Sequence, residues 1–477
     1  MRIWASIVCV CGILLAGCGG LESPSTSGRR SGAPTVGGSR LGATAAGRVG
    51  TVRATEAKYQ GWEALKLTNG IVTVVAVPSI GGRVMEYKLG PHPYLWVNPE
   101  EHGKLYDAPK TKEERTWHNY GGYKVWPAPQ KQWGGPPDPL GSTLDGGKWT
   151  GQIVPGERGM GTVRLVSPRD AGVTGLQITR EATLYGGTTR LAIKERFTNV
   201  SDKPVSWGIW DVTQVPGSLS KKQKASPQAR VYFPLNSDSA HPRGFYDMLA
   251  ESGGEPRGTE QWLPGVAPGI MGVKYLGQTG KIGADSMAGW IAYVDEAHEY
   301  CYVKRFKAEK LGKYPDKGST VEVYCSGDQS YMEVEVLSPV KDIQPGDSLT
   351  FTIDWYGARC GGPIIDCTEV GVTKEPLALE EDRERLVLTG VFGVFLPGTL
   401  QIVFEGGDGQ ELSRIGRVAV SPEKPLELKQ TVTVPQDATK VALALLNELG
   451  TPIGTLAELD LEVGPIARGG AGPRAEG

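Results

Sequence analysis

The sequence predicts an all-β protein built from sheets packed on sheets, and three observations support this. Short runs rich in Val, Ile, Thr and Tyr recur along the chain, and these residue types favour strands. Turn residues separate the runs, since the chain holds 67 Gly and 34 Pro. Helical periodicity is hard to find, and the best short helical candidate is Glu380–Arg385. Short strands at this spacing are typical of sandwiches and barrels.

The expected strands fall into two groups along the chain. The clearest strands of the first group lie at 70–78, 189–199, 205–215, 288–295, 320–326, 331–339 and 348–356. A boundary follows near Trp355–Gly362, beyond which the tryptophans cease. The strands of the second group lie at 386–395, 400–406, 427–435 and 440–448. Their spacing of about ten residues is typical of a small antiparallel sandwich of immunoglobulin type. We therefore expect a large β domain at 51–360 and an accessory β-sandwich at 363–464.

The N-terminus predicts export and lipidation. Arg2 precedes an apolar run from Ile7 to Leu15 that is too short to span a bilayer. The run leads into Leu-Ala-Gly-Cys, which resembles a bacterial lipobox ending at Cys18. Residues 1–17 are then a signal peptide, and acyl chains on Cys18 would anchor the protein to a membrane. An ordinary secretory signal with a nearby cysteine is the alternative. We expect a lipid-anchored protein of the bacterial cell envelope, facing the periplasm or the surface.

Two flanking segments have compositions that do not support a folded core. Residues 18–50 and 465–477 are rich in Gly, Ala, Arg and other small or polar residues, with little apolar bulk. Such segments bury too little surface to offset the entropy lost on ordering. We expect a disordered tether and a disordered tail.

Charge and cysteine content argue against several functions. The formal net charge is −2 and the basic residues are dispersed, so nucleic acid is not an expected partner. The spacings of the four cysteines in the body match no zinc motif. Cys301 and Cys325 lie in neighbouring strand-like runs, and they could pair across a hairpin or stay free and buried.

Cofactor and metal signals are also weak. The glycine-rich stretches GGTTR and IGGR lack the spacing of phosphate-binding loops. Asp138 and Asp145 could suit calcium, but two acids seven residues apart do not predict a site. We expect no cofactor and no structural metal.

The stretch 117–139, WHNYGGYKVWPAPQKQWGGPPDP, carries the strongest functional signal. Its five prolines and four glycines argue against a regular helix or a central strand across most of it. Indole faces beside fixed hydrogen-bonding groups suit a sugar ring, which has apolar C–H faces and a hydroxyl rim. The alternative is that the tryptophans pack the loop onto its own domain. The candidate substrate-binding residues here are Asn119, Lys124, Trp126, Gln130, Trp133 and Asp138.

Residues from about 60 to 357 resemble an uncharacterised bacterial family, a domain of unknown function, of the galactose-mutarotase-like superfamily. The resemblance rests on five stretches that follow the family order: 67–90, 118–139, 167–184, 197–215 and 332–356. It implies a large twisted β-supersandwich whose concave face binds carbohydrate in characterised relatives. Because the superfamily includes aldose epimerases, lyase and hydrolase domains and non-catalytic modules, the fold does not choose among these functions.

The resemblance also implies an acid–base chemistry, since the mutarotases pair a carboxylate base with a histidine acid. Glu333 and Glu335 are the candidate carboxylates, because strand alternation puts both on one face with Leu337. A solvated outer face is the alternative. His118, in the aromatic loop, and His241, in SAHPRGFYD, are the candidate acids. Neither lies in a recognisable copy of the mutarotase histidine motif.

Two more residues are candidates for contacts with a sugar. Arg83 follows a Gly-Gly turn and could bind vicinal hydroxyls or a carboxylate, or it could form a salt bridge within the sandwich. Trp207 and Trp210 lie three apart in an extended run, so they should point to opposite faces. We take Trp210 as the candidate.

These observations favour one function over two alternatives. We expect an envelope lipoprotein that binds a sugar or oligosaccharide on the concave face of a β-supersandwich. The first alternative is an aldose 1-epimerase, or mutarotase-like enzyme, with Glu and His as general base and acid. The second is a non-catalytic envelope scaffold whose partner is a protein.

Overall fold

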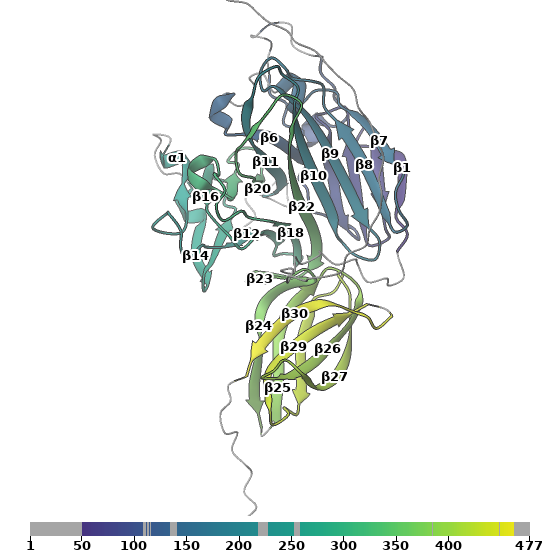
Figure 1. The fold of residues 1–477 in the computed structure, drawn as a ribbon, viewed down its shortest axis with the longest axis vertical. Coiled ribbons are helices and arrows are strands. Elements are labelled where there is room, and N and C mark those ends of the chain that lie inside the picture. Colours follow the sequence, from purple (N-terminus) through teal and green to yellow (C-terminus); the bar gives the residue numbers. More distant parts are fainter. Residues whose placement is uncertain are drawn as a thin grey trace, which may run out of the picture. The chain divides into compact units, whose positions relative to one another are not determined.

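The computed structural model of the chain describes residues 50–107, 111, 114, 116–133, 141–217, 228–251, 258–383, 385–447 and 449–461. The predicted signal peptide, Cys18, the tether up to residue 49, Asp138 and the predicted tail all lie outside these residues. Within them the chain is nearly all β and forms antiparallel sheets (Figure 1). The predicted fold class, a β-supersandwich followed by a small β-sandwich, is confirmed.

The first large sheet has twelve strands. In spatial order, ten of them are β1 (Arg53–Tyr59), β2 (Trp62–Thr68), β3 (Val72–Val77), β4 (Arg83–Leu89), β6 (Tyr123–Ala128), β11 (Val205–Pro216), β20 (Tyr331–Leu337), β19 (Val321–Cys325), β16 (Gly280–Ala284) and β13 (Tyr246–Asp247). The short strands β5 (His92–Pro93) and β21 (Lys341–Ile343) pair with β4 and β11. Segments far apart in the sequence therefore meet at the centre of this sheet.

The second large sheet has ten strands. In spatial order they are β14 (Trp262–Ala267), β15 (Ile270–Lys274), β12 (Ala229–Pro234), β17 (Trp290–Asp295), β18 (Tyr300–Phe306), β22 (Ser348–Arg359), β10 (Leu191–Asn199), β9 (Leu176–Tyr185), β8 (Met160–Val166) and β7 (Thr150–Val154). The few helical turns within the described ranges are short. They are Pro99–Glu101, Gln130–Gln132, Gly141–Asp145, α1 (Met248–Glu251), Thr259–Gln261 and Asp316–Gly318.

The two large sheets share one apolar core, because alternate residues of their strands point toward each other. Val334 and Val336 of β20 belong to the same buried cluster as Ile193 of β10 and Trp355 of β22. The ring of Tyr123, from β6, meets the Trp355 ring edge-on at 4.9 Å. The face of the twelve-stranded sheet that points away from this core is called its outer face below.

A charged network lies inside this core and links the two sheets. Glu195 of β10 accepts hydrogen bonds from Arg180 (2.5 Å) and from the Tyr123 hydroxyl (2.8 Å). Lys304 of β18 pairs with Asp211 of β11 and donates to the Val334 carbonyl at 2.7 Å. The side chains in both ion pairs are fully buried. We call Tyr123, Arg180, Glu195, Asp211 and Lys304 the inter-sheet network.

The aromatic stretch holds one short strand, and the rest of its described residues lie outside strands, as its prolines and glycines predict. Residues Tyr123–Ala128 form β6, a central strand of the twelve-stranded sheet, despite the proline at position 127. Proline is tolerated because the pairing of β6 with β4 involves only Tyr123 and Val84, so Pro127 has no strand neighbour on that side. The Pro127 carbonyl instead accepts a hydrogen bond from the Trp133 indole at 2.8 Å. The site is in effect a local strand edge, where proline costs no ladder hydrogen bond.

The C-terminal region forms two four-stranded sheets around their own apolar cluster. One sheet contains β23 (Asp366–Cys367), β24 (Gly371–Asp382), β25 (Arg385–Val394) and β28 (Leu426–Val432), and the other β27 (Glu411–Val420), β26 (Gly398–Gly406), β29 (Ala438–Leu446) and β30 (Pro452–Asp460). The helical candidate Glu380–Arg385 is wrong, because it contains the end of β24, the start of β25 and the turn that joins them. Strand pairing on both sides of this turn outweighs the weak helical pattern.

A second buried cluster joins this sandwich to the large sheets. Phe395 stacks on Tyr356 of β22 at 4.3 Å, and its carbonyl accepts a hydrogen bond from the Thr189 N–H at 2.8 Å. Whether 363–464 folds on its own remains a prediction.

The cysteines of the body are free and buried. Cys301 lies on β18 of one large sheet and Cys325 on β19 of the other, so they do not face each other across a hairpin. Among the described residues, no helix has the length and apolar character needed to cross a membrane.

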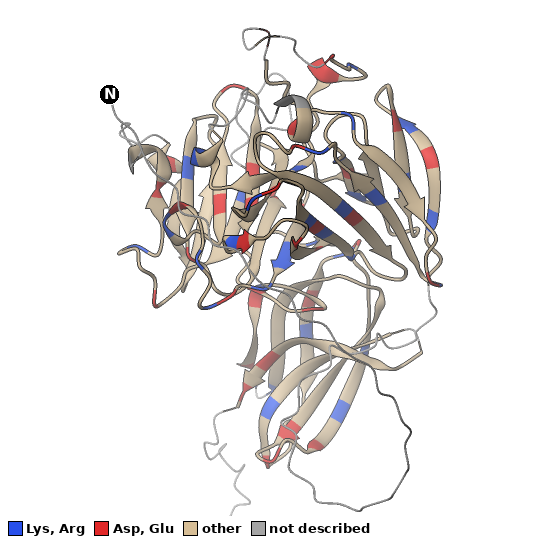
Figure 2. Ribbon diagram, turned by 45° about the horizontal axis from the view of Figure 1, so that its top comes forward, with Lys and Arg blue, Asp and Glu red and all other residues tan. Residues whose placement is uncertain are grey.

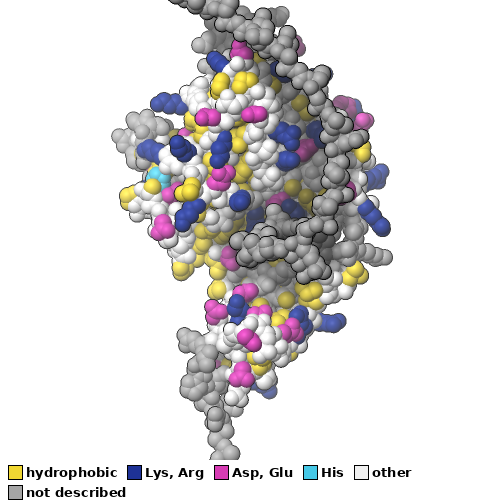
Figure 3. Space-filling model, viewed as in Figure 1, with side chains coloured by type: hydrophobic (Ala, Val, Ile, Leu, Met, Phe, Trp, Pro, Cys, Tyr) yellow, Lys and Arg dark blue, Asp and Glu magenta, His cyan; other side chains and the backbone are white. Residues whose placement is uncertain are grey.

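Charges of both signs are interspersed along the described strands (Figure 2). The face in Figure 3 likewise mixes Lys and Arg with Asp, Glu and apolar side chains. This distribution agrees with the near-neutral formal charge of the chain.

Candidate functional site

The candidate site lies on the outer face of the twelve-stranded sheet, and strand register assembles it. Lys124 of β6, Glu335 of β20 and Glu322 of β19 belong to one row across the sheet, because Val212 of β11 pairs with both Lys124 and Glu335. In the next row Gln214, Glu333, Tyr324 and Lys281 are successive partners. Side chains in register on adjacent strands lie about 4.5–5.5 Å apart at Cβ. Four distant segments of the chain therefore contribute to one group.

We call this group the polar cluster. It consists of Lys124, Trp210, Gln214, Lys281, Glu322, Glu333 and Glu335. Their neighbours in sequence, such as Met332, Val334 and Val336, belong to the core on the opposite side of the sheet. The prediction that Glu333 and Glu335 share one face is confirmed. The alternative of a solvated face is wrong, because both glutamates are buried and bonded to other side chains.

Glu335 and Glu322 share one lysine. Lys281 Nζ lies 3.0 Å from Glu335 Oε2 and 2.8 Å from Glu322 Oε2. The Trp210 indole donates to Glu335 Oε2 at 2.6 Å. The Oε1 atoms of both glutamates are buried and have no hydrogen-bond partner. Each of the two carboxyl groups therefore keeps a buried oxygen that no other group of the described residues bonds.

Glu333 occupies the neighbouring half of the polar cluster. Its Oε1 accepts from Lys124 at 3.1 Å and from the Gln214 amide at 2.9 Å. The side chain of Glu333 is 11% exposed and that of Lys281 is 14% exposed. Among the charged side chains of the polar cluster, Glu333 and Lys281 are therefore the most accessible to solvent or a ligand.

Burial changes the proton affinity of the glutamate pair. Burial raises the pKa of Glu322 to about 8, against the attraction of Lys281. Burial also raises the pKa of Glu335, and the nearby Glu333 adds to this shift. Burial alone would lower the pKa of Lys281, but Glu322 and Glu335 outweigh it and raise this pKa. Near neutral pH the lysine is therefore charged and one carboxyl of the pair carries a proton.

Two tryptophans of the site are held by cations and carboxylates. Lys124 lies over the Trp126 ring at 4.1 Å, and Lys281 lies over the Trp210 ring at 4.4 Å. The Trp126 indole donates to Asp145 at 2.8 Å, and Asp145 also pairs with Arg83 at 2.7 Å. In each indole, one ring face and the N–H are therefore occupied by contacts with other groups of the protein.

Of the two uses considered for Arg83, the salt bridge is the one found. The prediction that Trp207 and Trp210 point to opposite faces is also confirmed, because Trp207 donates to the Thr174 carbonyl at 2.8 Å while Trp210 bonds Glu335.

An aromatic row that the sequence reasoning missed borders the polar cluster. Trp96 lies 4.8 Å from Tyr331, and Tyr331 lies 6.1 Å from Tyr324. Tyr324 is the register partner of Glu333. Trp96 and Tyr324 are half-buried, so each presents part of its ring outward. We call Trp96, Tyr331 and Tyr324 the aromatic row.

Other predicted residues lie apart from the polar cluster. His118 stacks on Tyr106 at 3.4 Å, and burial lowers its pKa. His241 packs on Tyr246 at 4.5 Å. Within the described residues, no hydrogen bond or ring contact joins either histidine to Glu335. The structure therefore does not assemble the predicted glutamate–histidine pair.

The remaining described candidates of the aromatic stretch contact other groups of the protein. Trp133 meets Trp126 edge-on at 5.5 Å. The Asn119 amide donates to Gln329 at 2.6 Å, beside the aromatic stretch. Gln130 lies half-buried on the turn Gln130–Gln132, where its carbonyl accepts from the Trp133 N–H. Asp138 is outside the described residues, so a calcium site there stays untested.

No family model matches the chain, and no curated protein matches its sequence. Similar solved structures include a TPR-domain containing protein from Parabacteroides distasonis, with 11% identity and a TM-score of 0.43 over 65% of this chain and 49% of that one. This chain spans about half the length of that protein. Galactose mutarotase-like proteins are also similar, from Clostridium acetobutylicum (12% identity, TM-score 0.41, 65% of this chain, 99% of that one) and Lactobacillus casei (11%, 0.40, 62% and 99%).

At these identities and TM-scores, the likeness bears on neither the activity nor the ligand of this chain. Membership of the family named in the sequence analysis remains a prediction.

Proposed function

We propose that the outer face of the twelve-stranded sheet binds a carbohydrate. The observation that carries this proposal is the aromatic row beside the exposed edge of the polar cluster. Trp96 and Tyr324 offer partly exposed rings, and Glu333 and Lys281 keep part of their side chains accessible next to them. A sugar ring needs this combination, an apolar platform for its C–H face and charged groups for its hydroxyls.

The buried part of the polar cluster supports the proposal through positioning. Glu335 fixes Lys281 and Trp210, and Gln214 together with Lys124 fixes Glu333. Side chains held in place before binding lose little entropy when a ligand arrives. The exposed edges of Glu333 and Lys281 are therefore preorganised for hydroxyl groups.

A calorimetric survey of neutral and acidic oligosaccharides with the purified protein tests the proposal. Binding of at least one oligosaccharide is expected, and Tyr324→Ala should weaken it by about 1 kcal/mol, which is the worth of one aromatic contact. The exposed Tyr106→Ala variant is the matched control, since Tyr106 stacks on His118 and not on the aromatic row. Absence of binding across the survey would remove the proposal.

A second candidate function is acid–base catalysis at an anomeric carbon, and the Glu322–Glu335 pair favours it. Two carboxyls in direct register, whose pKa values burial raises, have the proton affinities of a general acid and a general base. Because both side chains are fully buried, catalysis would require the cluster to open toward the sugar. This version of epimerase chemistry places Glu322 in the role that the sequence analysis gave to histidine.

Polarimetry with free hexoses, pentoses and uronic acids tests this second function. If the protein is an epimerase, Glu335→Gln should slow anomeric equilibration by roughly 10²–10⁴-fold. Equilibration at the buffer rate in the presence of wild-type protein would dismiss the epimerase and leave the binding proposal intact.

We also propose that the protein is exported and lipid-anchored through Cys18, on the sequence pattern alone. Cys18→Ala should release the protein from the detergent-extracted membrane fraction. A mutant that stays in this fraction would contradict the anchor.

A further inference from the structure

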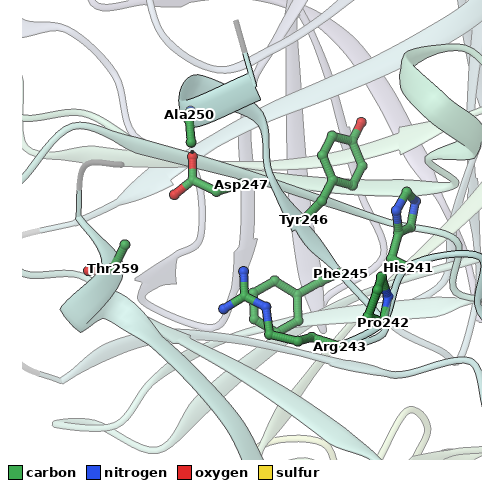
Figure 4. Close-up of a pocket in the computed structure, with 8 residues that line it drawn as sticks. All are labelled: His241, Pro242, Arg243, Phe245, Tyr246, Asp247, Ala250 and Thr259. Carbon is green, nitrogen blue, oxygen red and sulfur yellow. Dashed lines mark hydrogen bonds between the residues drawn. The ribbon is translucent and has the colours of Figure 1, made fainter. Parts of the chain in front are cut away.

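A pocket of about 440 Å³ opens at the β13 edge of the twelve-stranded sheet. Its volume lies within the roughly 300–1,000 Å³ of small-molecule sites. Figure 4 shows its side chains around a common space, and those with polar or aromatic groups are His241, Arg243, Phe245, Tyr246, Asp247 and Thr259. We call it the β13 pocket.

Arg243 brings a guanidinium group to the β13 pocket. Its guanidinium lies 4.5 Å over the Phe245 ring, and the side chain extends along this ring into the pocket (Figure 4). Among the described residues, no carboxylate lies within ion-pair distance of Arg243. The ring covers one face of the guanidinium and leaves its N–H edge free. This edge matches the two oxygens of a carboxylate.

The other walls of the β13 pocket suit hydroxyl groups and a ring. Asp247 Oδ1 accepts the N–H groups of Leu249 and Ala250. Among the described residues, the one hydrogen bond to its Oδ2 is a long contact of 3.4 Å from the Trp262 indole. Oδ2 can therefore accept a ligand hydroxyl. His241 Nε2 is buried without a hydrogen-bond partner, and such atoms normally have one.

The polar cluster and the β13 pocket differ in charge and are joined by Tyr246. Both lysines of the polar cluster already pair with its glutamates, whereas Arg243 in the β13 pocket pairs with no carboxylate among the described residues. Tyr246 follows Glu322 in the same register row, through Gly283 of β16, and its ring also lines the β13 pocket. A ligand that lies across the Tyr246 side chain would contact both the polar cluster and the β13 pocket.

We infer that the β13 pocket binds the carboxylate-bearing residue of an acidic sugar, through Arg243. The neutral remainder of the ligand lies on the outer face, so the inference rests on the proposed function. Asp247 Oδ2 and His241 bind hydroxyls of the acidic residue, and the Phe245–Tyr246 side supplies apolar contact.

The test compares D-glucuronate with D-glucose by calorimetry, on the full-length protein in detergent. The two sugars differ in whether C6 is a carboxylate or a CH₂OH group, so the difference in affinity reports the carboxylate contact. We expect glucuronate to bind at least about 10-fold more tightly, as a charge-assisted hydrogen-bond pair allows. Arg243→Gln should lower glucuronate affinity about 10- to 100-fold and leave glucose unchanged. Arg243→Lys should retain part of the affinity, because the charge stays and the paired geometry is lost.

The control is Arg417→Gln, which changes an exposed arginine of the C-terminal sandwich. It should leave both affinities unchanged. Because Arg243 is exposed, its variants should fold, and their melting temperatures check this.

Two outcomes overturn the inference. The first is an unchanged glucuronate affinity in Arg243→Gln. The second is displacement of glucuronate by equimolar inorganic sulfate, which would show a site for free anions. If either occurs while Tyr324→Ala still weakens a neutral oligosaccharide, the proposed function survives. If Tyr324→Ala has no effect on any sugar but glucuronate binding depends on Arg243, the outer-face proposal falls and the carboxylate site stands.

Discussion

The inter-sheet network and the polar cluster lie on opposite faces of the same strands, and they differ in charge balance. β11 sends Asp211 into the core and Trp210 and Gln214 to the outer face. The inter-sheet network pairs two cations with two carboxylates, and its ion pairs are fully buried. The polar cluster sets two lysines against three glutamates and keeps two side chains partly exposed.

This difference separates a structural use of charge from a functional one. A balanced and fully buried network is out of reach of a ligand, and its role is to hold two sheets in one register. The polar cluster has one more carboxyl than lysines, so it retains a proton, and it exposes the polar edges of Glu333 and Lys281. The inter-sheet network should therefore govern stability, and the polar cluster and aromatic row should govern ligand binding. The following variants test this division, in order of decreasing expected effect.

The largest effect is expected from breaking the inter-sheet network at Lys304. Lys304→Met leaves Asp211 buried without its cation, which should lower the free energy of unfolding by about 3–5 kcal/mol. Denaturant unfolding measures it. The double variant Lys304→Met with Asp211→Leu should recover most of the loss, because an apolar pair can replace a buried ion pair. A double variant as unstable as the single one would show that the pair itself is irreplaceable.

Removing Trp133 should cost stability but not ligand affinity. Its indole donates to Pro127 and its ring packs edge-on against Trp126 beneath the polar cluster. Trp133→Ala should destabilise the protein by about 3 kcal/mol, as a large aromatic-to-alanine change does in a core. Thermal melting and sugar titration on the same sample separate a loss of stability from a loss of affinity. Lost affinity with an unchanged melting temperature would assign Trp133 to the ligand instead.

The raised pKa of Glu322 in the glutamate pair predicts a pH dependence of stability. In the folded protein the pKa of Glu322 is about 8, whereas an unfolded glutamate titrates near 4.3. The folded state therefore binds more protons between these values, and stability should fall as pH rises through this window, by at most about 1.4 kcal/mol per pH unit.

Glu322→Gln should flatten that slope, because glutamine keeps the shape and cannot ionise. Denaturant unfolding between pH 5 and 8.5 measures it, with exposed Glu427→Gln as the matched control. An equally steep slope in Glu322→Gln would place the extra proton on another group.

The smallest effect is expected at the aromatic row. Tyr324→Ala should reduce sugar affinity by about 1 kcal/mol and change the free energy of unfolding little, because the ring is half-buried. Tyr324→Phe should keep most of the affinity, since the ring face remains. Equal losses in both variants would point to the hydroxyl group rather than to stacking.

Strand positions and faces were predictable from the sequence to a large extent. The alternation in MEVEVL correctly placed Glu333 and Glu335 on one face, because the side-chain period of a strand is fixed at two. The same rule applied to VEVYC would have placed Glu322 and Tyr324 on one face. Alternation does not show which strands become neighbours. The contact of Lys281 with Glu335 could therefore not be predicted from the sequence.

Local composition misled at two places for physical reasons. Prolines argued against a central strand across most of 117–139, yet Tyr123–Ala128 forms one, because one side of that strand lies mostly unpaired and needs no N–H from Pro127. Histidine content suggested acids at His118 and His241, but their packing on tyrosines is set by tertiary contacts that spacing does not encode.

The register row across the outer face also sets a length. It runs over six neighbouring strands, through Lys124, Val212, Glu335, Glu322, Gly283 and Tyr246. Since adjacent strands are about 4.8 Å apart, its ends are separated by roughly 24 Å. A single monosaccharide cannot touch both ends, whereas a chain of several residues can. Affinity should therefore rise with the degree of polymerisation and level off once the oligosaccharide spans the row. The width of the sheet would then set the preferred length of the ligand.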